Sequence, residues 1–290
     1  SGCCCRIRKI SSSAEGVSSK TSSAVTCKKP LRVWNLSLIA STLTWLVIRQ
    51  RLTEPRSMPT AKLYCPASAE PPAGVRVLER TQLVRSADLI LVLGGDGSLL
   101  GIARLSGPRA VPIFGIHHGD FGFLTESDAG KPYATLEKLL AGKCRVTRRT
   151  MLAVSVRRAG RAVIRSQALN DAVVHQGRVS RMLSLDVGVN GEHLAAYKGD
   201  GVVVATPTVS TAYSPSAGVQ ATAPTMSPTS VTPISPHTLS VRPLVLPDSS
   251  RIHVRVEPGC EDAVLTLDGQ EWFELAGGDD HFGLGDGDPA

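Results

Sequence analysis

The feature that most constrains the fold is an apolar run that ends in a glycine-rich turn. Residues 87–93 are apolar except for Asp88, and the sequence Gly-Gly-Asp-Gly-Ser follows at 94–98. A buried parallel strand has this composition, and such strands place ligands at their carboxyl ends. Glycines let backbone amides approach phosphate oxygens closely. The run predicts a phosphate loop, although a tight turn with a solvated aspartate also fits. The loop residues are Gly94, Gly95, Gly97 and Ser98.

Asp96 stands at the centre of this turn. A carboxylate repels phosphate, so phosphate affinity does not explain it. It suits a general base, or a contact to Mg²⁺, beside a hydroxyl that reacts. We therefore take Asp96 as the candidate catalytic residue.

The 290 residues predict two domains, because single hydrophobic cores commonly stop growing near this length. Helices are expected over 81–86 and 99–106 and a further buried strand over 111–116, which is the alternation of an α/β domain. From about residue 144, short β-branched segments are separated by Gly, Asn, Asp or Pro, and Asn190-Gly191 is a hairpin signal. We predict four parts: a disordered extension over 1–30, an α/β domain over 31–143, an all-β domain over 144–276, and a flexible tail over 277–290.

The apolar stretch over 33–48 has two interpretations. Its basic flanks are compatible with a signal peptide or a membrane anchor. It is shorter than the roughly 20 apolar residues that span a bilayer, and it carries several polar side chains. We expect a buried helix that packs on the first sheet, and no membrane partner.

Charge and cysteine content narrow the function classes. The net charge of +7 favours an anionic small-molecule ligand as readily as nucleic acid, and no nucleic-acid-binding motif is present. The seven cysteines form no paired CxxC ligands and are odd in number, so neither a zinc site nor a disulfide framework is indicated. A reducing cytoplasm fits this pattern best.

Three clusters in the second half carry polar groups. Asn170-Asp171 stands at a strand start, where an amide and a carboxylate can hold the two hydroxyls of a ribose, although alone the pair would more often be a turn. Asp200 opens a strand that ends in a loop rich in Ser and Thr around Tyr213. Leu267-Asp-Gly-Gln is by itself a plain hairpin turn.

Taken together, these motifs resemble the NAD kinases in order and spacing, from about residue 75 to 275. The matching segments are 94–98, 115–126, 169–171, Asp200 with 206–214, 232–240, 242–249 and 268–270. The glycine turn alone also occurs in lipid kinases and phosphofructokinases, so the middle motifs are the specific ones. The resemblance implies an α/β, Rossmann-like N-terminal domain followed by a β-sandwich, and assembly as a dimer or tetramer.

The activity that the resemblance implies is transfer of a phosphoryl group from ATP or polyphosphate to the 2′-hydroxyl of the adenosine ribose of NAD, giving NADP. Mg²⁺ is expected with ATP. By the same resemblance Asp96 accepts the hydroxyl proton, with Gly97 beside it, and Phe123 lines the adenine pocket. Asn170 and Asp171 hold ribose hydroxyls. The remaining implied NAD contacts are Arg181, Lys198, Asp200, Thr211, Ala212, Tyr213, Ser214, Pro215, Ser216 and Gln270.

The chain departs from the family at four places. Val209 stands where a glycine is usual, and a β-branched residue there would be strained by about 1–3 kcal/mol if the position needs a positive φ. His117 replaces a usual asparagine, the segment 219–231 is poorly hydrophobic, and no opening strand is recognisable in residues 1–57. A catalytically impaired NAD-binding relative is therefore the alternative function. A lipid kinase fits less well, because it would not explain Asn170-Asp171 or the 206–214 loop.

Overall fold

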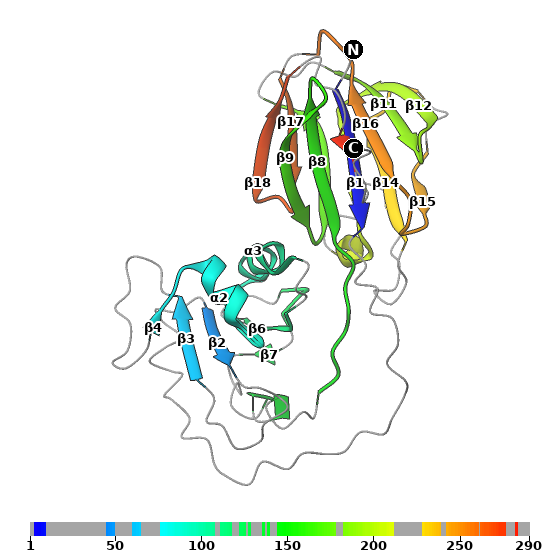
Figure 1. The fold of residues 1–290 in the computed structure, drawn as a ribbon. Helices are drawn as coiled ribbons and strands as arrows, with labels where there is room; N and C mark the ends of the chain where they lie inside the picture. Colours follow the sequence, from blue (N-terminus) through cyan, green and yellow to red (C-terminus); the bar gives the residue numbers. More distant parts are fainter. Residues whose placement is uncertain are drawn as a thin grey trace. The chain divides into compact units, whose positions relative to one another are not determined.

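A computed structural model provides the structure of the chain. It describes residues 3–9, 45–49, 60–64, 76–107, 111–117, 122–125, 127–128, 135–136, 138–139, 144–177, 182–211, 228–238, 242–260, 262–276 and 282–283. The chain divides into two compact units, residues 12–147 and residues 1–11 with 148–290, which we call the α/β unit and the β-rich unit (Figure 1). The division at 147/148 lies close to the predicted change of pattern near residue 144.

The α/β unit contains a six-stranded mixed sheet in the order β4-β3-β2-β5-β6-β7. In the part of this unit that the structure describes, helices α2 and α3 accompany the sheet (Figure 1). Among the described residues, neither helix is long and apolar enough to cross a bilayer. The bounds are β2 Trp45–Arg49, β3 Thr60–Tyr64, β4 Arg76–Val77, α2 Arg80–Ser86, β5 Leu89–Leu93, α3 Asp96–Ser106, β6 Ile113–His117 and β7 Ser127–Asp128.

Strand β5 is the predicted buried strand before the glycine turn. Ile90, Leu91 and Val92 are at most 1% exposed, and β5 runs parallel to β6 on one side. On its other side it runs antiparallel to β2, so the sheet is mixed. Helix α3 begins at Asp96, three residues before the predicted start. The predicted strand–turn–helix order is confirmed.

Strand β2 corrects the prediction of a buried helix over 33–48. Residues Trp45–Arg49 are a strand that pairs with both β3 and β5, whereas 33–44 lie outside the described residues. A short apolar run has no periodicity that separates strand from helix. Here β-branched Val47 and Ile48 and the two available partner strands favour the strand.

The β-rich unit consists of two antiparallel sheets. The seven-stranded sheet has the order β12-β11-β16-β1-β19-β8-β9, and the six-stranded sheet has the order β15-β14-β13-β10-β17-β18. The bounds are β1 Cys3–Lys9, β8 Leu152–Arg158, β9 Arg161–Ala168, β10 Asp171–Gln176, β11 Leu183–Val189, β12 Glu192–Gly199, β13 Gly201–Ala205, η2 Pro207–Thr211, β14 Thr229–Ile234, β15 Leu244–Leu246, β16 Ile252–Val256, β17 Ala263–Leu267, β18 Glu271–Leu275 and β19 Phe282–Gly283.

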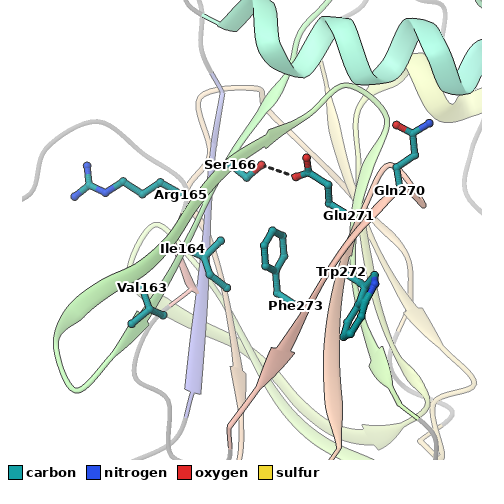
Figure 2. Close-up of a pocket in the computed structure, with 8 residues that line it drawn as sticks. All are labelled: Val163, Ile164, Arg165, Ser166, Gln270, Glu271, Trp272 and Phe273. Atoms are coloured by element: carbon teal, nitrogen blue, oxygen red, sulfur yellow. Dashed lines mark hydrogen bonds between the residues drawn. The ribbon is translucent and has the colours of Figure 1, made fainter. Parts of the chain in front are cut away.

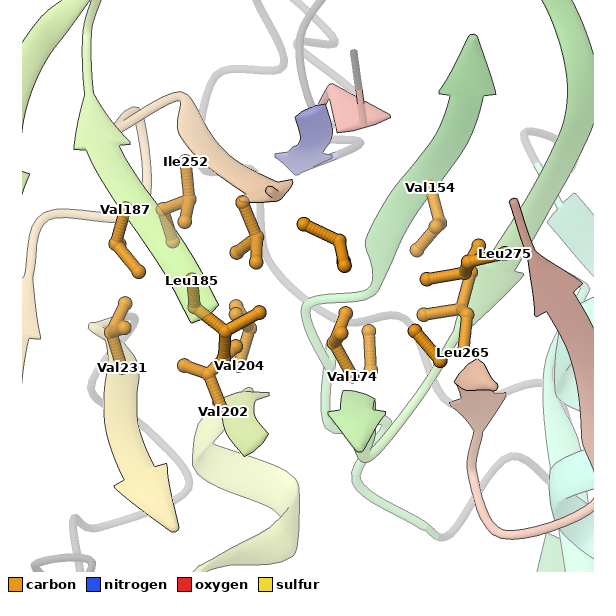
Figure 3. Packing of buried hydrophobic residues seen from close by; sticks show 14 of the residues in the cluster. Val154, Val174, Leu185, Val187, Val202, Val204, Val231, Ile252, Leu265 and Leu275 are labelled. Atoms are coloured by element: carbon orange, nitrogen blue, oxygen red, sulfur yellow. The ribbon is translucent and has the colours of Figure 1, made fainter. Parts of the chain in front are cut away.

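One hydrophobic core joins the two sheets. Along β8 and β11 buried and half-buried residues alternate, as expected of strands with one face on a core. Figure 3 shows the two inner faces meeting, and the labelled side chains include Val154, Leu185 and Ile252 from one sheet and Val174, Val204 and Leu265 from the other. The predicted short strands of this half are therefore real, and the β-sandwich is confirmed.

Strand β1 corrects the prediction that residues 1–30 are a disordered extension. Cys3–Lys9 pair with β16 on one side and with β8 on the other. Phe282–Gly283 likewise form β19 inside the predicted tail.

Candidate functional site

The glycine turn after β5 has one position where the local fold requires glycine. Gly94 has φ +155°, and a Cβ there would lie 3.0 Å from the Ser98 Oγ. Its N–H donates to the Ile116 carbonyl on β6 at 3.0 Å. Gly95 has an ordinary φ of −85° and open space where a Cβ would stand. The fold itself therefore does not require a glycine at position 95.

The other predicted loop residues belong to helix α3. Asp96, Gly97 and Ser98 form its first turn, and the Gly95 carbonyl accepts the Ser98 N–H at 3.0 Å. The positive end of the helix dipole therefore lies at the glycine turn. The amino end of a helix favours an anion such as a phosphate, and phosphate binding at this turn stays a prediction.

The Asp96 carboxylate is held by a turn 27 residues away in sequence. Its Oδ2 accepts the Phe123 N–H at 2.8 Å and its Oδ1 accepts the Leu124 N–H at 3.0 Å. A Cβ at Gly122 would collide with this carboxylate. Sequence reasoning assigned Gly122 no role. The signal that could have identified it was its position in the glycine-rich segment 115–126. The carboxylate is thus fixed in one orientation at the amino end of α3.

Phe123 follows directly after this glycine. Its side chain is 66% exposed, although its backbone bonds to Asp96. An exposed aromatic ring beside the candidate catalytic residue is available to contact a base. His117, the unusual residue of this turn, is the last residue of β6 and is buried.

In the β-rich unit, Asn170 and Asp171 lie where β10 begins. Three consecutive backbone N–H groups there donate to one carboxylate, that of Asp268 in the turn between β17 and β18. The Leu169 N–H donates to Oδ2 at 3.1 Å, and the N–H groups of Asn170 and Asp171 donate to Oδ1 at 2.7 and 3.3 Å. The Asp268 N–H in turn donates to the Asp171 carbonyl at 3.0 Å. Sequence reasoning regarded Asp268 as part of a plain turn.

Thr206 holds the same segment from the other side. Its Oγ1 donates to the Leu169 carbonyl at 2.6 Å and accepts the Thr208 N–H at 3.1 Å. Its own N–H donates to the Asn170 carbonyl at 2.8 Å. The structure therefore brings together the 169–171 motif, the start of the 206–214 motif and the 268–270 motif.

The electrostatics of the Asn170–Asp171 pair are unusual. Burial, and secondly the negative charge of Asp268, raise the pKa of Asp171 to about 7. The Asn170 Oδ1 is buried and accepts no hydrogen bond from the residues that the structure describes. A buried acceptor of this kind is costly unless a donor reaches it. A ligand hydroxyl is a suitable donor.

Val209 does not show the strain considered from the sequence. It lies inside η2, and it is absent from the described residues with a positive φ. Its side chain is 2% exposed and packs with Val203 and Ala205. The condition that the sequence analysis set for strain, a positive φ, is therefore not met at this position, because a 3₁₀ turn needs no left-handed residue here.

Lys198 and Asp200 lie at the opposite end of β13 from the Asn170–Asp171 pair. Asp171 pairs with Ala205, the last residue of β13, whereas Asp200 precedes its first residue. The five residues of β13 span about 17 Å. Lys198 is exposed, and the half-buried Asp200 accepts a hydrogen bond from the Gln176 Nε2 at 3.4 Å. One ribose cannot contact both ends of this strand.

Gln270 lines a groove between two edge strands. The groove has a volume of about 610 Å³ and lies between β9 and β18. Figure 2 shows Ile164 and Phe273 within it and Gln270 at one end, with the Ser166 Oγ donating to Glu271 Oε2 at 3.0 Å.

The remaining predicted residues have no described side chains. Thr211 ends η2, while Arg181, Ala212, Tyr213, Ser214, Pro215 and Ser216 lie outside the described residues. Within the described ranges, no group of three or more His, Cys, Asp or Glu is placed to hold a metal.

Comparison with known proteins decides the family. Residues 49–144 match the ATP-NAD kinase N-terminal domain, and residues 169–281 match the ATP-NAD kinase C-terminal domain. The NAD kinase of Geotalea daltonii is 43% identical over 201 residues, which are 69% of this chain and 71% of the relative. The chain belongs to the NAD kinase family. The NAD kinase of Geobacter sulfurreducens is 45% identical over 193 residues, or 67% of this chain and 68% of the relative.

Solved structures agree with this assignment. The yeast NADH kinase in complex with NADH has a TM-score of 0.66 at 32% identity, and the match covers 71% of this chain and 60% of that one. An NAD kinase from Archaeoglobus fulgidus in complex with ATP has a TM-score of 0.58 at 29% identity, with 70% and 78% covered. The family resemblance stated from the motifs is thereby confirmed.

Proposed function

We propose that this chain is a phosphotransferase that converts NAD to NADP by phosphorylating the 2′-hydroxyl of the adenosine ribose. The observation that carries the proposal is the Asp96 carboxylate. It is fixed by two backbone amides at the amino end of a helix, directly after a glycine turn, in a chain of the NAD kinase family. Such a carboxylate can accept the proton of an attacking hydroxyl.

In the α/β unit, different residues have different proposed roles in the reaction. Asp96 orients the 2′-hydroxyl and accepts its proton. The glycine turn (94–98) and the first-turn amides of α3, with Gly97 among them, face the phosphate groups, and the exposed Phe123 ring contacts adenine. Phosphoryl transfer depends mainly on positioning and charge stabilisation, and this geometry supplies both.

The β-rich unit supplies ribose contacts. The free Oδ1 of Asn170 accepts one ribose hydroxyl, and Asp171 holds the other. Lys198 and Asp200 contact the dinucleotide only if it extends along β13, since they lie at the far end of that strand. Arg181, the 211–216 loop and Gln270 complete the proposed contacts.

A divalent cation is proposed to accompany the phosphoryl donor. Mg²⁺ is commonly bound through one or two carboxylates together with substrate phosphates. Each oxygen of Asp96 accepts a single amide hydrogen bond in the described residues, so each keeps a lone pair for a direct or water-mediated contact. When bound, the ion neutralises phosphate charge. Either ATP or polyphosphate is compatible with this arrangement.

The alternative functions have less support. An impaired enzyme was motivated by Val209 and by the segment 219–231. Val209 is packed without strain, whereas 219–227 lie outside the described residues. A lipid kinase does not explain the hydrogen-bonded Asn170–Asp171 pair. Assembly as a dimer or tetramer, a cytoplasmic location and the absence of nucleic-acid and membrane partners stay predictions.

The test is NADP formation by the purified chain. NAD or NADH is supplied with ATP or polyphosphate and Mg²⁺, and product is followed with an NADP-specific dehydrogenase. We expect turnover with at least one donor and its loss on chelation of the metal. Folded protein that phosphorylates a diacylglycerol or a sphingoid base, but neither dinucleotide, would contradict the proposal.

A further inference from the structure

The turn between β17 and β18 contains a carboxylate that the turn itself does not need. Asp268 and Gly269 have φ values of +51° and +64°. Asparagine serves such a position as well as aspartate does, as the Asn190-Gly191 hairpin of the same unit shows with φ values of +54° and +91°. Asn190 is exposed, whereas Asp268 is only 8% exposed. Burial of a charge at a hairpin turn is expensive and therefore indicates a specific partner.

The partner is the backbone of the Asn170–Asp171 pair. The Asp268 carboxylate accepts three consecutive amides across about 98 residues of sequence. Hydrogen bonds to an ionised acceptor are the strong ones. Because three successive N–H groups converge on it, the backbone of residues 169–171 has little freedom, and the side chains of Asn170 and Asp171 leave it in fixed directions.

The second effect of Asp268 is its charge. Asp171 faces Ala205 on β13, and the next residue of β10 faces Leu267 on β17. Thr206, before η2, is uncharged. Burial, and secondly the negative charge of Asp268, raises the pKa of Asp171 to about 7. Asp171 therefore changes its protonation state in the neutral range.

We propose that Asp268 is a positioning residue for NAD binding: its carboxylate orients the Asn170–Asp171 pair through three backbone amides, and its charge contributes to a pH dependence of the affinity for NAD. The proposal rests on the assignment of that pair to the ribose hydroxyls. As the pH rises, Asp171 becomes a carboxylate that accepts a ribose O–H more strongly than the acid does. The KM for NAD therefore falls as pH rises through neutrality.

The test compares Asp268→Asn with the wild-type full chain. The amide keeps the turn preference and one acceptor oxygen but removes the charge and one acceptor. kcat and the KM for NAD are measured from pH 5.5 to 8.5. We expect the KM at pH 8 to rise about 10-fold with kcat at saturating NAD within about 3-fold, since one hydrogen bond to a charged acceptor is lost. The pH at which the KM changes moves to a lower value. Asn190→Asp, the reverse exchange in the exposed hairpin, should leave kcat, KM and pH profile unchanged.

Two outcomes would overturn the proposal: an unchanged KM and pH profile, or a fall in kcat with no change in KM. If Asp268→Asn does not fold, Asp268→Glu retains the charge. It should keep the inflection near neutral pH while raising the KM, and loss of the inflection in this variant would contradict the charge effect. Calorimetric titration with NAD measures binding independently of catalysis, so it tests the role of Asp268 separately from the proposed function. Wild-type protein that binds NAD without forming NADP would remove the proposed function, while the Kd and its pH dependence would still test the role of Asp268.

Discussion

Two carboxylates in this molecule accept backbone amides in similar ways and are used differently. Asp96 accepts two amides from the turn at 122–125 and is half-buried. Asp268 accepts three amides and is nearly inaccessible to solvent. In the α/β unit the carboxylate that is held is itself the reactive candidate. In the β-rich unit the anchor is a separate residue, which leaves Asn170 and Asp171 available for the ligand. In the α/β unit one residue, Asp96, is both hydrogen-bonded to the backbone and the candidate for ligand contact. In the β-rich unit Asp268 binds the backbone, and different residues are the candidates for ligand contact.

The largest effect is expected from Asp96→Asn. Because this carboxylate is proposed both to orient the 2′-hydroxyl and to accept its proton, turnover should fall by about two to four orders of magnitude. Steady-state kinetics with NAD and donor measure it. Glu79→Gln is the matched control, since Glu79 is an exposed acid of the same unit that makes no side-chain capping hydrogen bond. Turnover of Asp96→Asn within a few-fold of wild type would remove Asp96 from the chemistry.

Val209→Gly tests whether the segment next to the Asn170–Asp171 pair is packed or strained. Loss of a side chain that is 2% exposed, together with the added backbone freedom of glycine, should destabilise the protein by about 3 kcal/mol. Val209→Ala should cost less, and neither variant should increase turnover. Urea unfolding and kcat measure the two effects. A glycine variant that is more stable and more active would show that the valine is strained after all.

Asp171→Asn tests the charge of the β-rich site through stability. The folded pKa of Asp171, about 7, lies above its ordinary value of 3.8, so the unfolded chain releases this proton first. The free energy of unfolding of the wild type therefore falls as pH rises from about 4 to 7. Between pH 5 and pH 7.5 the variant should lack up to about 3 kcal/mol of this decline. Urea unfolding at pH 5 and 7.5 measures it, with exposed Glu192→Gln as control. Equal pH dependence in wild type and variant would contradict the assignment.

Thr206→Val tests the hydrogen bonds of the hydroxyl by which Thr206 holds the backbone at residue 169. The valine has nearly the same shape but leaves the buried Leu169 carbonyl and the Thr208 N–H without this hydroxyl. We expect a loss of about 2 kcal/mol in the free energy of unfolding. Thr206→Ser retains the hydroxyl and should lose less than half as much. Identical losses in the two variants would indicate that only packing matters at this position.

Sequence reasoning succeeded where the signal is local and failed where it comes from distant pairing. The buried run of β5 and the short β-branched segments of β8 and β11 are properties of a few consecutive residues, and both were predicted. Strand β1 was not, because Cys3–Lys9 is identified as a strand only by its partners β8 and β16, far along the chain.

The same distinction holds for the site. Asp96 and Asn170-Asp171 stand out by residue type, and the motif order identified the family. The role of Asp268 depends on contacts to residues about 98 positions away, and that of Gly122 depends on its approach to Asp96. A two-residue turn signal reveals neither contact.

In this molecule Asp96 is proposed to accept the proton of the reacting hydroxyl, and the Asn170–Asp171 pair is proposed to bind NAD. Single-turnover rates as a function of NAD concentration, for Asp96→Asn and Asn170→Ala, give a Kd and a limiting rate for each variant. The account predicts that Asp96→Asn keeps the Kd within about 3-fold and loses the rate, while Asn170→Ala weakens the Kd by about 10-fold or more and keeps the limiting rate within a few-fold. Two variants that lose Kd and rate in the same proportion would contradict this division.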